Sequence, residues 1–401
     1  MRKFLLITVI FVFIIVLSVS CTNTSVAKSK ISTLESENAE LKTKTSESVT
    51  ETTVAEATEA KEAVTETTQA EVKKEFSLSL AGNLYISGYT PTVWVEGDNA
   101  YLTSGNSFKI VDISDKENPK ILASVDVTGG YMDFCVKDNY AYIPYQVWDQ
   151  NTNTTKDSGF QVIDISDKEN PKIVGEYKTK GQIINVFAAD KYIYTAFQVA
   201  EVKDNYYKVV ESGFQIVDIT DKEKPTLVGK YSSKSQNGIN AMCVDSDGNF
   251  AYVLDDQYLK IIDVTNKDSF TEKGKLYLPI WSNFLYFKDN YLYVSSTNAL
   301  EIIDVSDKEK PTLTGGVFSK GNISKIFVLE DSVYLAYSIY LYSQNNREVV
   351  ESGFQIMDLK SLKPMGEIKI NGEAMGVFVS GNYAYVATGP TGLQIVKLFN
   401  E

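Results

Sequence analysis

From residue 76 onward, the chain alternates short apolar segments with clusters of Gly, Asn, Asp and Pro. The apolar segments are four to eight residues long and rich in Val, Ile, Tyr and Phe. Segments of this kind are typical of β-strands, and the intervening "KDNY", "SGNY" and "DSDGN" are typical of tight turns. No stretch after residue 76 has sustained helical periodicity. The pattern therefore predicts an all-β fold.

The strands recur as a repeated unit. A Tyr-centred strand occurs seven times, and a following strand that ends in "IVD" or a close variant also occurs seven times. The shared tyrosines are Tyr101, Tyr142, Tyr194, Tyr252, Tyr293, Tyr334 and Tyr385. The last positions of the second strand are Asp112, Asp164, Asp218, Asp263, Asp304, Asp358 and Lys397. Four strands in a unit of about 45 residues match the size of a β-propeller blade.

The phase of the repeat also predicts how the ring closes. The last unit ends just after its third strand, "LQIVKL", and lacks a fourth. The repeat region begins with "FSLSLAGNLYISG" at Phe76, which has the pattern of a fourth strand on its own. We therefore expect a seven-bladed β-propeller with four-stranded blades, whose last blade is closed by the N-terminal strand.

Two stretches carry a resemblance to a known family. "FQIVDISDKENPKIVG" and "GNYAYVATGPTGLQIVKL" resemble the LVIVD-repeat proteins, and the resemblance covers roughly residues 76–401. It implies an exported bacterial or archaeal β-propeller, and most members of the family have no assigned function. The resemblance is specific for the fold and indicates little about activity.

The repeated phrase "IVDISDKENPK" has the composition of a strand end followed by a turn. Ser114 and Glu117 have the spacing of a capping box, and Pro119 ends the turn. Lys397 replaces the aspartate only in the unit that has no following turn. We therefore expect Asp112 and its equivalents to bind turn backbone and not a ligand.

The N-terminus has the features of an export signal. Arg2 and Lys3 precede an apolar run that ends in "LSVSC", where Cys21 resembles the lipidated cysteine of bacterial lipoproteins. An uncleaved membrane anchor is the alternative. Residues 21–75 contain no aromatic side chain and are rich in Thr, Glu, Ala, Ser and Lys. We expect residues 1–20 to be a signal peptide, 21–75 a lipid-anchored, disordered tether, and 76–401 an extracytoplasmic propeller at the cell surface or on the periplasmic side.

The composition limits the kinds of partner and of catalytic chemistry that are expected. The formal net charge of −13 argues against nucleic acid as a partner, and the absence of histidine removes the commonest general base and metal ligand. Asp245, Asp247 and Asn249 lack the downstream Glu of a calcium loop, so we expect a turn there. No cofactor, metal or catalytic residue is predicted.

Two of the three cysteines share one position of the first strand with large aromatic residues, which indicates a packing role. The members of this column are Trp94, Cys135, Phe187, Cys243, Tyr286, Phe327 and Phe378.

Three units are longer than the others. The spacing from the shared tyrosine to the end of the "IVD" strand is 11 or 12 residues in four units and 22 or 24 in the second, third and sixth. The extra residues alternate in polarity around a turn and read as a hairpin extended beyond the blade, on the face opposite the "SDKENP" turns. The hairpins are predicted to flank a ligand-binding cleft at the mouth of the channel. Its candidate lining residues are Tyr131, Tyr145, Trp148, Tyr206, Tyr207, Trp281, Tyr340, Tyr342 and Arg347.

These observations favour a binding or interaction module whose ligand is a protein, a peptide or a glycan. One alternative is a carbohydrate- or small-molecule-active enzyme at the channel mouth, which would use carboxylates such as Asp133, Glu211 or Glu351. The other is a purely structural component of the cell envelope. The candidate aromatic residues could equally pack the hairpins against each other, because large rings usually pack first.

Overall fold

The computed structural model describes residues 76–128, 133–149, 154–203, 206–235, 237–279, 282–343 and 346–400. All of them belong to the second of two units into which the chain divides, Val72–Glu401. The predicted signal peptide and tether, with Cys21, lie outside the described residues. Within the described ranges, no helix is long and apolar enough to cross a membrane.

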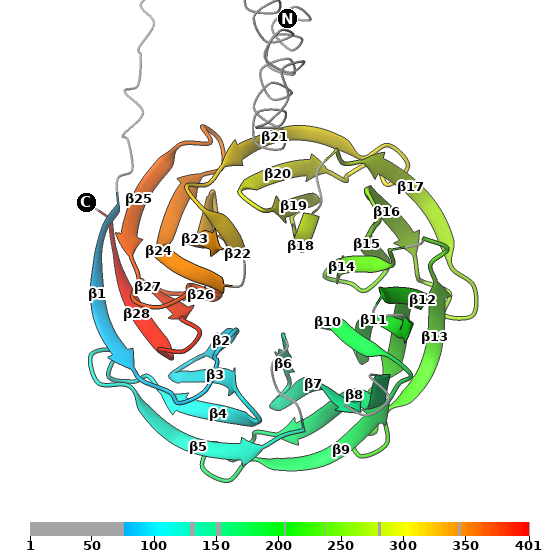
Figure 1. Cartoon of the computed structure of the whole chain (residues 1–401), viewed down its shortest axis with the longest axis horizontal. Coiled ribbons are helices and arrows are strands. Elements are labelled where there is room, and N and C mark those ends of the chain that lie inside the picture. The colour runs from blue at the N-terminus through cyan, green and yellow to red at the C-terminus, as the bar shows by residue number, and fades with distance from the viewer. Residues whose placement is uncertain are drawn as a thin grey trace, which may run out of the picture. The chain divides into compact units, whose positions relative to one another are not determined.

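The described strands form seven antiparallel four-stranded sheets arranged as blades around a central axis (Figure 1). Blade 1 contains β2 (Val93–Glu96), β3 (Asn99–Ser104), β4 (Ser107–Asp112) and β5 (Lys120–Asp126). Blade 2 contains β6 (Cys135–Lys137), β7 (Tyr140–Asp149), β8 (Thr154–Asp164) and β9 (Lys172–Lys178). Blade 3 contains β10 (Gln182–Ala189), β11 (Tyr192–Lys203), β12 (Tyr206–Asp218) and β13 (Thr226–Ser232). Blade 4 contains β14 (Ile239–Val244), β15 (Phe250–Asp255), β16 (Tyr258–Asp263) and β17 (Thr271–Tyr277).

The remaining blades follow in the same order. Blade 5 contains β18 (Ser282–Lys288), β19 (Tyr291–Ser296), β20 (Ala299–Asp304) and β21 (Thr312–Phe318). Blade 6 contains β22 (Asn322–Leu329), β23 (Ser332–Ser343), β24 (Asn346–Asp358) and β25 (Pro364–Lys369). Blade 7 contains β26 (Gly376–Ser380), β27 (Tyr383–Ala387), β28 (Leu393–Asn400) and β1 (Phe76–Leu84). The strands of each blade are called a to d from the axis outward.

The predicted ring closure is confirmed. β1 is strand d of blade 7 and pairs antiparallel with β28 from Phe76 opposite Asn400 to Leu84 opposite Leu393, with one bulge (Figure 1). Because strands of one blade come from both ends of the described region, the ring is fastened by backbone hydrogen bonds and by the packing of the blade-7 core.

The core lies between neighbouring blades. Each of the seven repeated tyrosines on strand b is nine-tenths or more buried. Each lies directly opposite the predicted packing column on strand a, as in Trp94 opposite Tyr101 and Cys243 opposite Tyr252. The prediction for the cysteines is confirmed, since Cys135 and Cys243 are free and buried. Burial raises the pKa of both thiols.

The aspartate that ends strand c does bind the turn. Its carboxylate accepts a hydrogen bond from the backbone N–H two residues later, at 2.9 Å from Ser114 to Asp112 and at 2.9 Å from Ser166 to Asp164. The expected capping box is replaced by Asp115, whose carboxylate accepts from the Glu117 N–H at 3.0 Å. A carboxylate is the stronger acceptor at this position, and the Ser114 side chain bonds Asp112 instead. The phrase is therefore structural.

Each "SDKENP"-type turn also joins two blades. Gly175 lies on strand d of blade 2, and a Cβ added to it would lie 2.0 Å from the Lys222 carbonyl oxygen of blade 3. The Lys222 ammonium also lies 5.4 Å from the ring centroid of Tyr140 in blade 2. The pairs Gly82–Lys116, Gly229–Lys267 and Gly274–Lys308 repeat this contact. The turn therefore recurs because each blade contacts its predecessor through it.

Candidate functional site: the hairpin face

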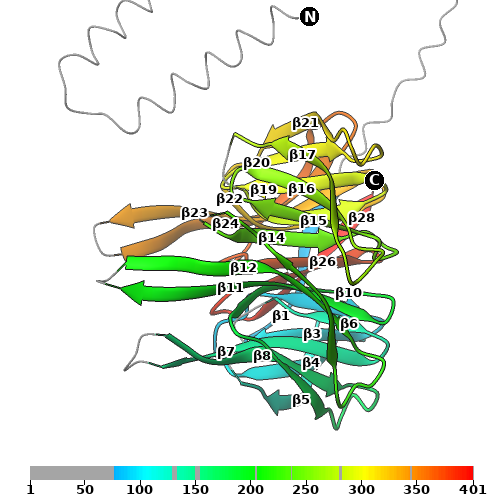
Figure 2. The ribbon, with the colours of Figure 1, turned by 90° about the vertical axis from the view of Figure 1, so that its right-hand side faces the viewer.

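The three long units form three ribbons on one side of the ring. A ribbon is the part of a b–c hairpin that extends beyond strands a and d of its blade, in β7–β8, β11–β12 and β23–β24 (Figure 2). The side with the ribbons and the d–a connections is called the hairpin face. The opposite side, with the a–b and c–d turns, is called the turn face. The positions of the three insertions are as predicted.

The ribbons share one construction at their base. In each ribbon an acidic residue is followed by Ser and Gly. A one-residue bulge lies just before the acidic residue, at Lys156, Val210 and Val350. Each carboxylate binds a lysine of strand d, at 2.8 Å from Asp157 to Lys178 and 2.5 Å from Glu211 to Lys230. In the third ribbon, Glu351 binds two lysines, Lys320 at 2.6 Å and Lys369 at 2.8 Å. The hydrogen bond from Lys320, followed by that from Lys369, lowers the pKa of Glu351 to about 2.

The blade-6 ribbon brings three predicted residues together. The Tyr340 hydroxyl and the Arg347 Nη2 each donate to Oε1 of Glu373 at 2.8 Å, and the guanidinium lies 4.5 Å from the centroid of the Tyr340 ring. The ring of Tyr342 lies 6.0 Å from that of Tyr340 and is largely exposed. Glu373 is 5% exposed and also accepts from the Tyr89 hydroxyl at 3.0 Å. Tyr340 and Arg347 therefore fasten the ribbon to the ring.

Burial is the first cause that raises the pKa of both tyrosines in this cluster. The pKa of Tyr89 and that of Tyr340 rise to about 12, and the neighbouring Glu373 carboxylate adds to each shift. Both hydroxyls therefore stay protonated at neutral pH and act as donors to Glu373. This leaves Glu373 as the one acceptor of a three-donor cluster, which is a suitable partner set for a buried carboxylate.

The other candidates divide into four groups. Tyr145 is buried, and its hydroxyl lies 3.5 Å from Asp157, so it packs at the base of its ribbon. Trp148 is 41% exposed on β7. Tyr206 and Tyr207 lie on β12 opposite Lys203 and Val202. Tyr131 and Trp281 lie outside the described residues.

The channel is crossed close to the hairpin face. Asp133, at the start of blade 2, pairs with Lys325 on β22 of blade 6, which is separated from blade 2 by at least two blades in either direction. The Lys325 ammonium also lies 4.5 Å from the ring centroid of Phe284 in blade 5. In the packing column, the rings of Tyr286, Phe327, Phe378 and Trp94 form a chain with centroid distances of 6.0, 4.7 and 5.2 Å.

Exposed aromatic rings collect on the hairpin face. Among the residues whose side chains the structure describes, eight aromatic side chains are exposed, and six of them lie on the ribbons, on the b–c turns or at the ends of the d strands. These six are Tyr85, Trp148, Tyr258, Tyr277, Phe318 and Tyr342. The other two, Tyr291 and Phe399, lie at the turn face. Exposed aromatic residues gathered on one surface are typical of interaction sites.

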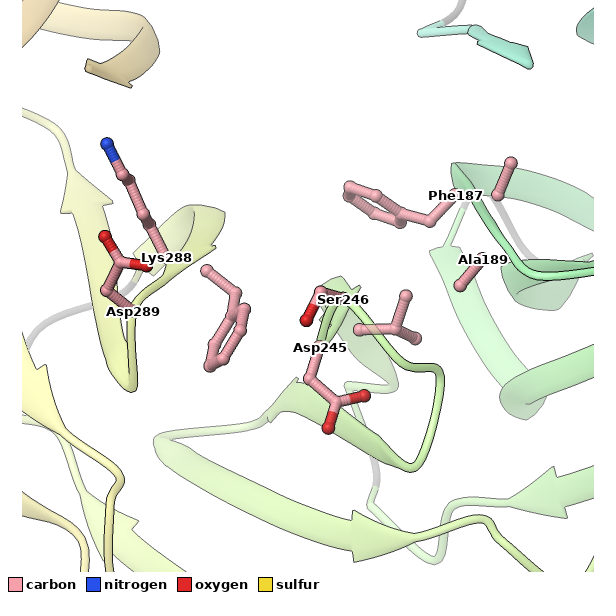
Figure 3. Close-up of a pocket in the computed structure, with 9 residues that line it drawn as sticks. Phe187, Ala189, Asp245, Ser246, Lys288 and Asp289 are labelled. Carbon is pink, nitrogen blue, oxygen red and sulfur yellow. The ribbon is translucent and has the colours of Figure 1, made fainter. Parts of the chain in front are cut away.

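A shallow depression of about 300 Å³ lies at the turn face instead. It is lined by residues at the a–b turns of blades 3, 4 and 5, including Phe187, Ser246 and Lys288 (Figure 3). Asp245 at its edge accepts from the Asn249 and Phe250 N–H groups at 2.7 and 3.1 Å, which confirms the predicted tight turn. Within the described ranges, no group of three or more Cys, Asp or Glu side chains is placed to hold a metal ion.

Sequence reasoning missed three parts of this face: Glu373 with Tyr89, the Asp133–Lys325 pair, and the exposed rings outside the ribbons. Tyr277 and Phe318 are the last residues of strand d, so the repeat phase already places them on the hairpin face. Glu373 has no such signal, because it lies in the irregular d–a connection between β25 and β26.

A family model described as "LVIVD repeat" matches six intervals of the chain. They are residues 87–127, 128–179, 196–233, 240–277, 285–318 and 371–397. The interval between the last two matches contains blade 6, with the fastened ribbon. No curated protein matches the chain.

Two solved structures with a similar fold are distant from this chain in sequence. The β-propeller domain of Cps50 (Swd1) from Myceliophteria thermophila aligns with a TM-score of 0.59 at 12% identity, covering 80% of this chain and 100% of that one. The computationally designed Ika8 protein aligns with a TM-score of 0.53 at 10% identity, covering 79% and 99%. At such identities the likeness shows the β-propeller fold alone.

Proposed function

Because the chain belongs to the LVIVD-repeat family and folds as a seven-bladed β-propeller, we propose that it is a binding module whose partner docks on the hairpin face. The observation that carries this proposal is the gathering of six of the eight exposed aromatic side chains on that face. Aromatic residues supply large contact areas at low cost in side-chain entropy.

The hairpin face lies opposite the end of the propeller at which the chain enters it. The chain enters the propeller at Phe76, the first residue of a d strand, and d strands start at the turn face. The C-terminal end of β28 lies on the same side, opposite the ribbons (Figure 2). We propose that Cys21 carries a lipid and that the body lies outside the cytoplasmic membrane. The ribbons then point away from the side at which residues 1–75 join.

Lipidation has a direct test. Metabolic labelling with a palmitate analogue should mark the wild-type chain and leave Cys21→Ser unlabelled and released from membranes. Equal labelling of both chains contradicts the proposal.

We propose binding without catalysis at this face. The three carboxylates considered for an enzyme are each held by lysine: Asp133 by Lys325, Glu211 by Lys230, and Glu351 by Lys320 and Lys369. Each of these carboxylates is therefore already engaged in an ion pair, and Glu351, whose pKa is lowered to about 2 by Lys320 and Lys369, is a poor general acid. The ion pair of Asp133 also joins blade 2 to blade 6 across the channel.

The test compares exposed rings of the two faces on the full-length chain. One variant combines Tyr277→Ser, Phe318→Ser and Tyr342→Ser, on blades 4, 5 and 6, and the control combines Tyr291→Ser and Phe399→Ser on the turn face. Each is expressed in the source cells, crosslinked there, and purified with its partners. We expect the hairpin-face variant to lose at least about tenfold of the captured partner, which corresponds to about 1.4 kcal/mol of binding free energy. Equal capture by wild type and that variant, or loss in the control alone, overturns the proposal.

A further inference from the structure

Each ribbon has an inner edge, formed by its strand b, and an outer edge, formed by its strand c. The inner edge of the blade-6 ribbon differs in its residues from those of the other two ribbons. The pairing of β22 with β23 ends at Asn322 opposite Ser338, so no strand of the described chain pairs with Ile339 to Ser343 on the edge away from β24. This segment reads Ile-Tyr-Leu-Tyr-Ser and contains no charge, proline or glycine. Its Leu341 and Tyr342 side chains are 60% and 66% exposed. An uncharged, unpaired edge of this kind is a template for strand addition.

The equivalent edges are protected by charge. The shared register places Asp149 of blade 2 and Glu201 of blade 3 at the position of Leu341. An acidic side chain on an edge strand opposes pairing with another chain, because the charge loses water when a strand is added. The inner edges of the blade-2 and blade-3 ribbons therefore carry an acidic residue at this position, whereas that of blade 6 carries an exposed leucine.

The blade-6 edge is also held in place. Tyr340 and Arg347 bind the buried carboxylate of Glu373, which fixes one side of the ribbon against the ring. On the outer edge, the bulge at Val350 interrupts the ladder. An extended edge that is already ordered loses less conformational entropy on binding than a free loop does. The inner edge is therefore better suited to strand addition than the outer edge.

We propose that the inner edge of the blade-6 ribbon, Ile339 to Ser343, binds an extended, uncharged peptide segment of another protein by strand addition. This rests on the proposed function, because it names the partner class for the hairpin face. Charge complementarity selects an uncharged segment, since side chains opposite Ile339, Leu341 and Ser343 would meet no counter-charge on that edge.

The contact size disfavours a second copy of this chain as the occupant. Five residues span about 17 Å of strand. Two copies joined edge to edge over that length would bury roughly a few hundred Å² per partner, well below the ~800 Å² per partner of a stable interface. A short peptide needs only weak and reversible binding, and additional contacts to the exposed rings of the face can strengthen it.

The test uses the full-length chain in mild detergent and a fluorescent probe peptide. The probe has six alternating threonines and valines with one lysine at each end, and a second probe is N-methylated at every central residue. We expect measurable binding of the first probe, protection of the 339–343 amides from hydrogen exchange, and at least tenfold weaker binding of the methylated probe. Methylation removes the N–H donors of strand pairing and leaves the side chains in place.

Two single substitutions complete the test. Leu341→Glu places on blade 6 the residue that blade 3 has at this position, and it should weaken binding at least tenfold. Val350→Glu adds the same charge to the outer edge, 62% exposed in the native chain, and should change binding less than twofold. Both sites are exposed, so melting temperature and circular dichroism should match the wild type.

The outcomes separate this inference from the proposed function. No probe binding at millimolar concentration, equal binding of the methylated probe, or equal weakening by both substitutions overturns strand addition. If strand addition fails and the hairpin-face aromatic variant still loses its partner, the proposed function stands and the partner class is wrong. If that variant also keeps its partner, both fail.

Discussion

Replacing Gly175 with alanine tests how neighbouring blades are joined. A Cβ at this position would lie 2.0 Å from the Lys222 carbonyl oxygen of the next blade, whereas ordinary contacts begin at 3.4 Å, so the turn must move by about 1.4 Å. Overpacking of this kind costs about 1–3 kcal/mol, and the reduced entropy of the unfolded chain returns about 0.4–1 kcal/mol. We expect a net loss of about 1–2 kcal/mol and a melting temperature lower by roughly 2–6 °C.

The matched control is Gly315→Ala in blade 5, at the same position of strand d. The nearest atom to its Cβ is the Leu362 Cδ1 at 3.3 Å, the end of a flexible side chain. Differential scanning calorimetry of both full-length variants should show an unchanged or slightly higher melting temperature for Gly315→Ala. If the two variants melt at the same temperature, docking of the turn onto the preceding blade does not stabilise the ring.

Three further predictions concern the turn, the tyrosines and the cysteines. Asp164→Ala should lower the free energy of unfolding by about 1 kcal/mol in urea titrations, because the Ser166 N–H loses its acceptor. Lys397→Ala removes the residue at the equivalent position of blade 7, where no such turn follows, and should leave the free energy of unfolding unchanged. Equal effects of the two substitutions would refute the turn role. Burial raises the pKa of Tyr101 and Tyr385 to about 12, while an unfolded tyrosine ionises near pH 10, so their stabilisation is complete below pH 10 and is lost as the pH rises toward 12. Tyrosinate absorbance at 295 nm from these residues should then appear together with unfolding, and ionisation in the intact fold near pH 10 would contradict their burial. In a Cys21→Ser chain, Cys135 and Cys243 should not react with a thiol reagent at pH 8 before denaturant is added; rapid reaction of either thiol would refute their burial.

The sequence predicts most of the ring because its signals are periodic. The tyrosine column, the aspartates before the turns and the closing strand each depend on positions that recur once per blade. A recurring residue reports on a recurring environment, so counting alone places Cys243 opposite Tyr252. The positions of the three ribbons follow in the same way, from where the period is broken.

The role of each ribbon residue could not be predicted from the period. Tyr145 and Tyr340 lie near the bases of two different ribbons, but one is buried beside Asp157 and the other binds Glu373 from a distant connection. Such contacts depend on the twist and bend of each ribbon, which the sequence pattern does not specify. The same limit applies to Asp133 and Lys325, which are 192 residues apart and meet across the channel.

The Leu341 position illustrates what the structure adds to the sequence. The alignment of the three ribbons by their bulges identifies Asp149 and Glu201 as its equivalents. The insertions of blades 3 and 6 have the same length and both contain "VVESGFQI", so the sequence alone aligns Glu201 with Leu341, whereas the blade-2 insertion is two residues shorter and needs its register to be aligned. The pairing of the strands adds the equivalence of Asp149 and shows that β22 leaves Ile339 to Ser343 unpaired.

Hydroxyl-radical footprinting tests most directly whether the hairpin face is the binding surface. The full-length chain is labelled in its native cells and again after purification in detergent, and the oxidation of individual rings is compared by mass spectrometry. The account predicts that Tyr258, Tyr277 and Phe318 are protected in cells and that Tyr291, at the turn face, is labelled equally in both samples. Protection of Tyr291 with full labelling of the three hairpin-face rings would contradict it.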